Sequence, residues 1–122
     1  MAVSGPDFIS LQVTDLEASA RFYEKYLGLT RAKSSPPHAV VFDTQPIAFA
    51  VRDVLPDVDL DASSRPGQGV GLWLHARDAR AIHTALVADD VAIVLDPVDG
   101  PFGFTFVFAD PDGYHVTLHD RG

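Results

Sequence analysis

Histidine is the side chain of this chain that could best serve acid–base or metal chemistry, since its 122 residues include five histidines and no cysteine. His115 and His119 share one face of an expected strand, roughly 13 Å apart at the usual rise per residue. That separation keeps them from binding one metal ion, which needs about three protein donors. His75 and His38 lie on other expected strands. Metal-free proton transfer by His75, His115 or His119 stays an open alternative, because imidazole titrates near neutrality.

Aromatic and small residues accompany these histidines. Trp73 lies two residues after Gly71 and two before His75 in an expected strand over 70–76, so all three positions face the same side. Thr117 lies midway between the two histidines of the last strand. A surface of aromatic, small and hydrogen-bonding groups suits a planar or conjugated ligand held by stacking. The alternative is that Trp73 is simply a core residue.

The elements that position these residues begin with the stretch 8–29. Residues 8–13 alternate as a strand does, and the sequence TDLE predicts a capping box in which the Thr14 hydroxyl accepts from the Glu17 amide. Gly28 stands where a helix needs a left-handed residue to end. Helical spacing gives the intervening helix one apolar face, formed by Leu16, Ala20, Tyr23 and Leu27.

The second half repeats this plan more weakly. Asp78 is expected to cap a helix that carries Ala79, Ile82 and Leu86 on one face, with Asp90 as its left-handed end. Further strands are expected over 29–34, 38–42, 47–51, 91–95, 104–108 and 115–119, with a loop over 96–102.

Each half therefore reads as strand, helix and three strands. Two such βαβββ units predict an α+β fold in which each unit supplies an incompletely covered sheet. We expect a single domain over 1–122, with a first module over about 6–52, a polar Pro- and Gly-rich connector over about 53–69 and a second module over about 70–120.

The net charge of the chain limits the classes of partner that it can bind. A formal net charge of −8 and a pI near 4.7 argue against nucleic acid as a partner, because phosphate binding needs a basic surface. An acidic surface attracts cationic ligands, although it also serves solubility alone. The sequence contains no apolar run long enough to cross a membrane and no signal peptide, so we expect no membrane association and a cytoplasmic location.

Two motifs carry a family resemblance across nearly the whole chain. VTDLEASARFYEKYLGL near the start and FADPDGYHVTL near the end resemble the vicinal oxygen chelate superfamily, which includes glyoxalases, extradiol dioxygenases and bleomycin-binding proteins. The resemblance implies two βαβββ modules that form a cup-shaped curved mixed sheet around a ligand site, and it implies a homodimer. The metal-ligand positions of the family fall at Phe8, around 48–50, and at Gly71 and Thr117, none of which supplies the usual ligand.

The chain most resembles the bleomycin-binding branch, whose members are acidic and also lack the metal ligands. Phe102, in the loop GPFG, together with Trp73 and His38, matches positions where that branch carries aromatic residues. The resemblance implies metal-independent binding of an aromatic or cationic small molecule, giving antibiotic resistance, with no cofactor and no catalytic residue. The alternative is a glyoxalase- or dioxygenase-like lyase, isomerase or oxygenase with displaced metal ligands. The expected ligand-binding residues are Trp73, Phe102, His38, His75, Phe8, Phe49, Gly71, His115 and Thr117.

Overall fold

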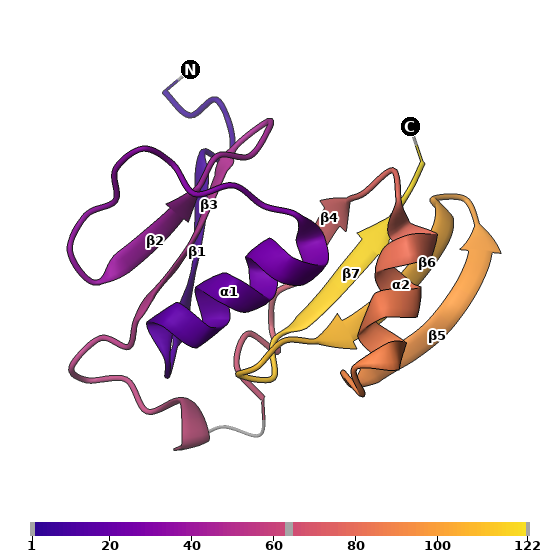
Figure 1. The fold of residues 1–122 in the computed structure, drawn as a ribbon. Coiled ribbons are helices and arrows are strands. Elements are labelled where there is room, and N and C mark those ends of the chain that lie inside the picture. The colour runs from indigo at the N-terminus through magenta and orange to yellow at the C-terminus, as the bar shows by residue number, and fades with distance from the viewer. Residues whose placement is uncertain (1, 63–64, 122) are drawn as a thin grey trace. The chain divides into compact units, whose positions relative to one another are not determined.

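The computed structural model describes residues 2–62 and 65–121, and in each half a strand and a helix come before further strands, as the sequence predicts (Figure 1). The chain divides into two compact units, Met1–Asp59 and Leu60–Gly122. The division falls within the predicted connector, which contains a 3-10 turn at Leu60–Ala62. No helix in the described part of the chain is long and apolar enough to cross a membrane. The fold is α+β, with one helix and one mixed sheet in each unit.

Unit 1 contains a three-stranded sheet and one helix. Its strands lie in the order β1-β3-β2, with β1 parallel to β3 and β2 antiparallel to β3. The strand predicted over 29–34 was wrong in extent: only Arg31 bridges to Phe42, beside a 2.8 Å hydrogen bond from the Ala32 amide to the Val41 carbonyl. The elements of this unit are β1 (Phe8–Val13), α1 (Leu16–Leu27), β2 (Ala39–Phe42) and β3 (Ala48–Asp53).

Helix α1 begins and ends through side-chain and backbone caps. Asp15, not Thr14, occupies the N-cap position, and its carboxylate accepts a 3.0 Å hydrogen bond from the Ala18 amide. The N-cap therefore lies one residue after Thr14, where the predicted capping box placed it. Gly28 ends the helix with a left-handed φ of 68°, as predicted.

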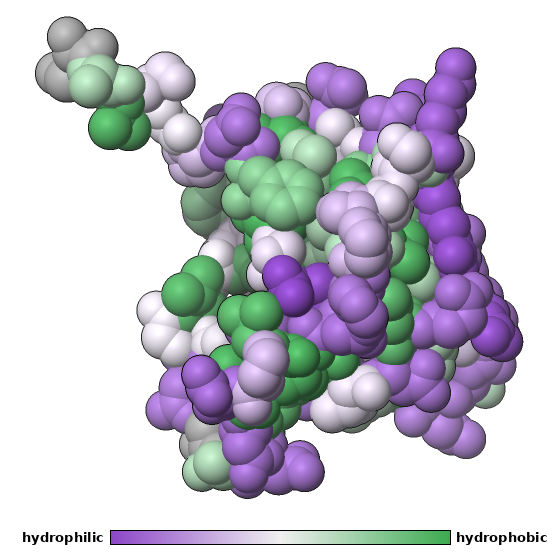
Figure 2. Space-filling model, turned by 90° about the vertical axis from the view of Figure 1, so that its left-hand side faces the viewer, coloured by the Kyte–Doolittle hydropathy of each residue, from purple (hydrophilic) through white to green (hydrophobic). Residues whose placement is uncertain are grey.

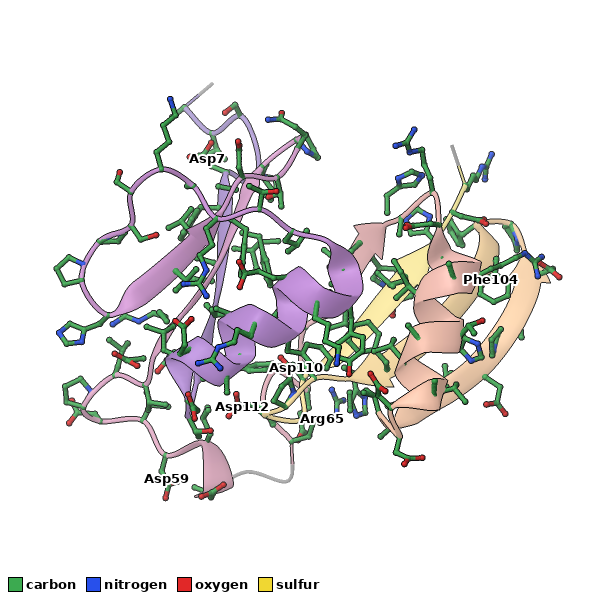
Figure 3. The ribbon with its side chains drawn as sticks, in the orientation of Figure 1. Asp7, Asp59, Arg65, Phe104, Asp110 and Asp112 are labelled. Carbon is green, nitrogen blue, oxygen red and sulfur yellow. The ribbon has the colours of Figure 1, made fainter. Side chains whose placement is uncertain are left out.

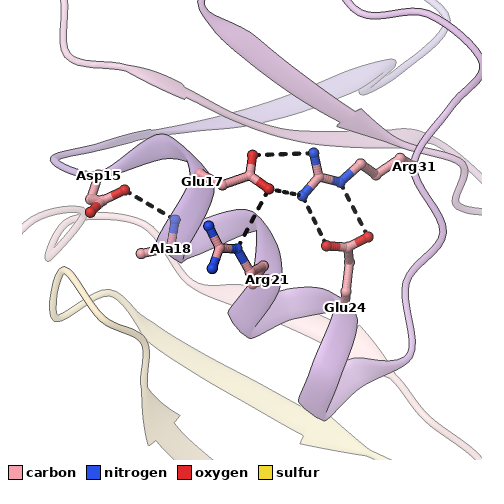
Figure 4. Close-up of polar contacts among 6 residues, drawn as sticks. All are labelled: Asp15, Glu17, Ala18, Arg21, Glu24 and Arg31. Atoms are coloured by element: carbon pink, nitrogen blue, oxygen red, sulfur yellow. Dashed lines mark hydrogen bonds and ion pairs between the residues drawn. The ribbon is translucent and has the colours of Figure 1, made fainter.

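A network of charges joins α1 to the chain that follows it (Figure 4). The Arg31 guanidinium donates to Glu17 at 2.7 Å and to Glu24 at 3.0 Å, so one side chain joins the first and last turns of the helix. The hydrogen bond from Arg31 lowers the pKa of the Glu17 carboxyl, and the two carboxylates raise the pKa of Arg31. These groups are partly exposed, so their role is to fix the chain after α1 against the helix.

The core of unit 1 lies between α1 and its sheet. Tyr23 contacts Phe49 with ring centroids 5.2 Å apart and Phe42 at 6.3 Å, and all three side chains are buried. Figure 2 views the face of the molecule that unit 1 forms, where apolar and hydrophilic side chains are interspersed. The segment before β1 extends beyond the end of that strand (Figure 1).

Unit 2 repeats this topology with one more full strand. Its sheet has the order β4-β7-β6-β5, and its first and last strands are again the parallel pair. The helix predicted from Asp78 is present with Ala79, Ile82 and Leu86 buried, although the Asp78 side chain makes no capping hydrogen bond. The elements are β4 (Leu72–His75), α2 (Ala79–Ala88), β5 (Ile93–Gly100), β6 (Gly103–Ala109) and β7 (His115–His119).

Strand β5 is longer than predicted. The sequence from Asp96 to Phe102 was expected to be a loop, but the strand continues through Pro97 to Gly100. Proline is tolerated there because β5 is the edge strand, whose outer side needs no amide donor. Two register shifts, between Ile93 and Leu95 and between Leu95 and Val98, mark irregular pairing along it.

The turn between β6 and β7 is held by a buried carboxylate. Asp110 is only 5% exposed, and its Oδ1 accepts hydrogen bonds from the amides of Asp112 at 3.0 Å and Tyr114 at 2.9 Å. Gly113 completes the turn with a φ of 93°. Figure 3 shows Asp110 and Asp112 in this turn, with Arg65 close by. The predicted hairpin around residues 110–113 is confirmed.

Candidate ligand-binding site

Alternation along the strands of unit 2 gives its sheet two different faces. Phe106, Phe108, Val116 and Leu118 are buried on the face that α2 covers. Phe104 shares that face, beside α2 in Figure 3, with the Arg80 guanidinium 4.4 Å from its ring centroid. The intervening residues point to the opposite side, which we call the distal face. Its members are Trp73, His75, Leu95, Val98, Thr105, Val107, Thr117 and His119.

Cross-strand register arranges the distal face in two rows, because directly paired residues point to the same side of a sheet. Each row passes from aliphatic side chains on β5 to an aromatic ring or imidazole on β4, with a threonine between them. The first row is Leu95, Val107, Thr117 and Trp73, and the second is Val98, Thr105, His119 and His75. This confirms that Trp73, His75, Thr117 and His119 share one face.

Four rings meet at the β4 end of these rows, and we call them the aromatic cluster. His119 is at the centre, with its ring centroid 6.0 Å from Trp73, 5.5 Å from His75 and 6.1 Å from Phe102. Trp73 and Phe102 also meet edge to face at 5.2 Å. The two large rings are 51% and 47% exposed, which is unusual for side chains of this size. A planar molecule can therefore reach both.

Phe102 joins the cluster because its turn is tied to the end of β7. The Asp120 carboxylate accepts from the Phe104 amide at 2.8 Å, and the Arg121 amide donates to the Phe102 carbonyl at 3.1 Å. The Arg121 guanidinium adds a 2.7 Å bond to the Pro101 carbonyl. Gly103 provides the left-handed φ of 78° that brings β6 out of the turn. Residues 120–121 therefore position a ring that is nearly twenty residues away in sequence.

His119 carries the feature that most distinguishes the cluster. Its Nδ1 atom is buried and has no hydrogen-bond partner among the described residues. An unpaired buried nitrogen costs about 1–3 kcal/mol unless water or a ligand satisfies it. His119 was absent from the predicted site, although its alternation with Thr117 in β7 placed it on the same face.

Two other predicted residues of unit 2 lie outside the cluster. Gly71 precedes β4, and an added Cβ there would lie 3.5 Å from the Trp73 indole nitrogen, so the glycine leaves room beside that ring. His115 lies at the other end of β7, paired with Ala109. Burial lowers the pKa of His115, and the positive charge of Arg65 lowers it further.

The predicted residues of unit 1 are dispersed. Phe8 is 52% exposed on β1, but Phe49 is buried in the core under α1, on the opposite face of the sheet. Phe49 is therefore a core residue and is left out of the candidate site. His38 is exposed, and its Nδ1 lies 3.0 Å from the Asp53 carboxylate.

The residues at the four metal-ligand positions of the resemblance do not fit a metal ion. They offer a phenyl ring at Phe8, methyl groups at Ala48 and Ala50, no side chain at Gly71 and a hydroxyl at Thr117. Within residues 2–62 and 65–121, no group of three or more His, Asp or Glu side chains could hold a metal. The aromatic cluster can instead stack with a planar molecule and form a hydrogen bond through His119.

Comparison with known proteins identifies the family and the fold. The family model described as the glyoxalase/bleomycin resistance protein/dioxygenase superfamily matches residues 5–118. The structure of TnmS3, an antibiotic binding protein from Streptomyces sp. CB03234, is similar with a TM-score of 0.74 and 26% identity, covering 100% of this chain and 99% of that one. A glyoxalase-related enzyme from Fulvimarina pelagi is similar with a TM-score of 0.74 and 25% identity, covering 97% and 88% of the two chains.

The fold is also shared with UcmS2, at a TM-score of 0.73 and 23% identity, covering 97% of this chain and 98% of that one. No curated protein sequence matches the chain. The family match covers both modules, the motif at α1 and the β6–β7 turn. The chain therefore belongs to the glyoxalase/bleomycin resistance protein/dioxygenase superfamily.

Proposed function

We propose that this protein binds and sequesters an aromatic or cationic small molecule, and that this molecule is an antibiotic. We propose that binding needs no metal ion. The observation that carries the proposal is the aromatic cluster, in which Trp73 and Phe102 each leave about half of their surface exposed beside His119. Stacking on such rings holds conjugated molecules without any reacting group. The side chains at the family's metal-ligand positions support binding without a metal, because none of them is a usual metal ligand.

Two further observations support this class of ligand. The net charge of −8 favours a cationic molecule through long-range attraction that salt weakens. The similarity to TnmS3 supports an antibiotic, since that protein is described as antibiotic binding. We also propose that the working form is a homodimer, which sedimentation analysis at several protein concentrations tests.

The experiment uses Trp73, the only tryptophan in the chain. Bleomycins, anthraquinones and mitomycins are titrated into the metal-free protein while its fluorescence is followed, and calorimetry confirms any hit. We expect saturable quenching at micromolar or tighter affinity for at least one compound, which is then recovered intact. Phe102→Ala should weaken that binding about tenfold or more, whereas Val87→Ala, on the exposed side of α2, should leave it unchanged. Absence of binding across the panel would refute the proposal.

One observation favours an enzyme as the second candidate. His75 and His119 are edge to face at 5.5 Å on the distal face, and paired imidazoles can transfer protons. The glyoxalase-related neighbour is consistent with such chemistry. Recovery of an altered compound, or turnover that His75→Ala abolishes while binding persists, would favour this candidate over sequestration.

A further inference from the structure

We infer that His119 determines specificity in the proposed site, and that its Nδ1 atom binds a hydroxyl group carried on a planar aromatic ligand. The inference rests on the proposed function, because it concerns which molecules the aromatic cluster accepts. It goes further by assigning a polar contact to one atom and a chemical group to the ligand.

The protein itself leaves the Nδ1 atom of His119 without a hydrogen-bond partner among the described residues. The atom is also buried. Thr105 is the direct cross-strand neighbour of His119, but its hydroxyl donates to the Gly103 carbonyl at 3.1 Å. The remaining neighbours, Trp73, His75 and Phe102, contact His119 through ring faces and edges. A buried polar atom surrounded in this way gains a partner when a ligand brings one.

A ligand must also be able to reach the Nδ1 atom of His119. The rings of Trp73 and Phe102 that flank His119 are about half exposed, and Phe102 comes from a turn. A planar molecule can reach His119 by displacing one of these rings, and no buried side chain of the α2 face needs to move. The ligand ring then stacks on the same aromatic groups that frame the imidazole.

The chemistry of imidazole indicates which group of the ligand can pair with Nδ1. A neutral imidazole nitrogen is a donor in one tautomer and an acceptor in the other. A hydroxyl group can both donate and accept, so it matches either tautomer, whereas an ether oxygen only accepts. A hydroxylated aromatic compound therefore satisfies Nδ1 in either tautomer.

The test compares 2-naphthol, 2-methoxynaphthalene and naphthalene as probes, using NMR titration of the ¹⁵N-labelled full-length protein. We expect 2-naphthol to bind about tenfold more tightly than naphthalene, as one added hydrogen bond to a buried atom implies. 2-Naphthol should also shift the ¹⁵Nδ1 resonance of His119 strongly and naphthalene should not, whereas 2-methoxynaphthalene should do so only if Nδ1 carries the proton.

Two variants of His119 separate the contribution of its Nδ1 atom from that of its ring. His119→Phe keeps an aromatic ring but removes Nδ1, and it should bind naphthalene and 2-naphthol equally. His119→Asn places an amide near the position of Nδ1 and should retain part of the preference. The wild-type probe comparison decides the question even where a variant does not fold.

Equal binding of the three probes to the wild-type protein, with no change at ¹⁵Nδ1, would overturn the inference while leaving aromatic binding intact. Failure of every probe to perturb the Trp73 and Phe102 resonances would instead contradict the proposed binding surface. The two failures are therefore distinguishable.

Discussion

Replacing Gly103 by alanine tests how the turn that carries Phe102 is held. The φ of Gly103 is 78°, which a residue with a Cβ adopts at a cost of about 1 kcal/mol. The added Cβ would also overlap the Asp120 carboxylate oxygen and approach the Arg121 backbone nitrogen to 3.2 Å. Asp120 must then move, and its 2.8 Å bond to the Phe104 amide is lost.

The expected loss follows from these two effects. An unsatisfied, partly buried amide costs about 1–3 kcal/mol, so Gly103→Ala should reduce the free energy of unfolding by about 2–4 kcal/mol. Urea denaturation, followed by circular dichroism at fixed protein concentration, measures this change. Gly100→Ala is the matched control in the same turn, because its Cβ would meet nothing within 4 Å. The control should stay within about 0.5 kcal/mol of wild type.

A double-mutant cycle tests whether the clash at Gly103 and the loss of the Asp120 hydrogen bond are the same effect. Asp120→Ala alone should cost about 1–3 kcal/mol through the same Phe104 amide, and adding it to Gly103→Ala should cost much less. Additive losses would mean that the clash and the hydrogen bond are unrelated. A Gly103→Ala protein as stable as wild type would show that the turn tolerates the side chain and that Phe102 is not held as described.

Two further predictions concern single side chains. Asp15→Ala should destabilise the protein by about 1 kcal/mol, because it removes the acceptor of the Ala18 amide, whereas Asp78→Ala should have little effect since Asp78 makes no capping bond; urea denaturation compares them. The pKa of His115 lies below its ordinary value of 6.5, so the unfolded chain takes up the proton more readily and stability should fall as pH decreases through that value. NMR titration should give a midpoint below 6.5, and Arg65→Ala should move it upward; a midpoint at or above 6.5 in the wild type would contradict the burial of His115.

Local signals in the sequence predicted much of the fold. Helix α1 could be found from its apolar spacing and Gly28, because both act within one element. Alternation predicted that Trp73 and His75 share one face, and that Thr117 and His119 share one. Such patterns are reliable where one face of the element is buried.

The errors arose where tertiary context decides. Pro97 signalled a loop, but an edge strand accommodates proline, and the sequence does not reveal which strand is at the edge. The shift from Thr14 to Asp15 at the helix cap is a difference of one residue between two good capping side chains.

Only some residues of the candidate site could be predicted, because tertiary context also decides which side chains meet there. Trp73 and Phe102 were both expected to bind ligand, but their 5.2 Å contact depends on a turn tied to Asp120 and Arg121, which no local pattern encodes. Phe49 was assigned to a ligand-facing position, although register with Ile9 places it under α1. The central position of His119 among the four rings depends on cross-strand pairing, which the sequence alone does not show.

The two rows of the distal face have a consequence for how this protein could change. Side chains in the rows alternate with the buried ones that pack on α2, so a substitution at Val107 or Thr117 alters the proposed binding surface without touching the core. The proposed binding surface and the core are thereby encoded in separate, interleaved sets of positions. A library restricted to the row positions would explore new ligands at little cost in folding, and selection can act on this chain in the same way.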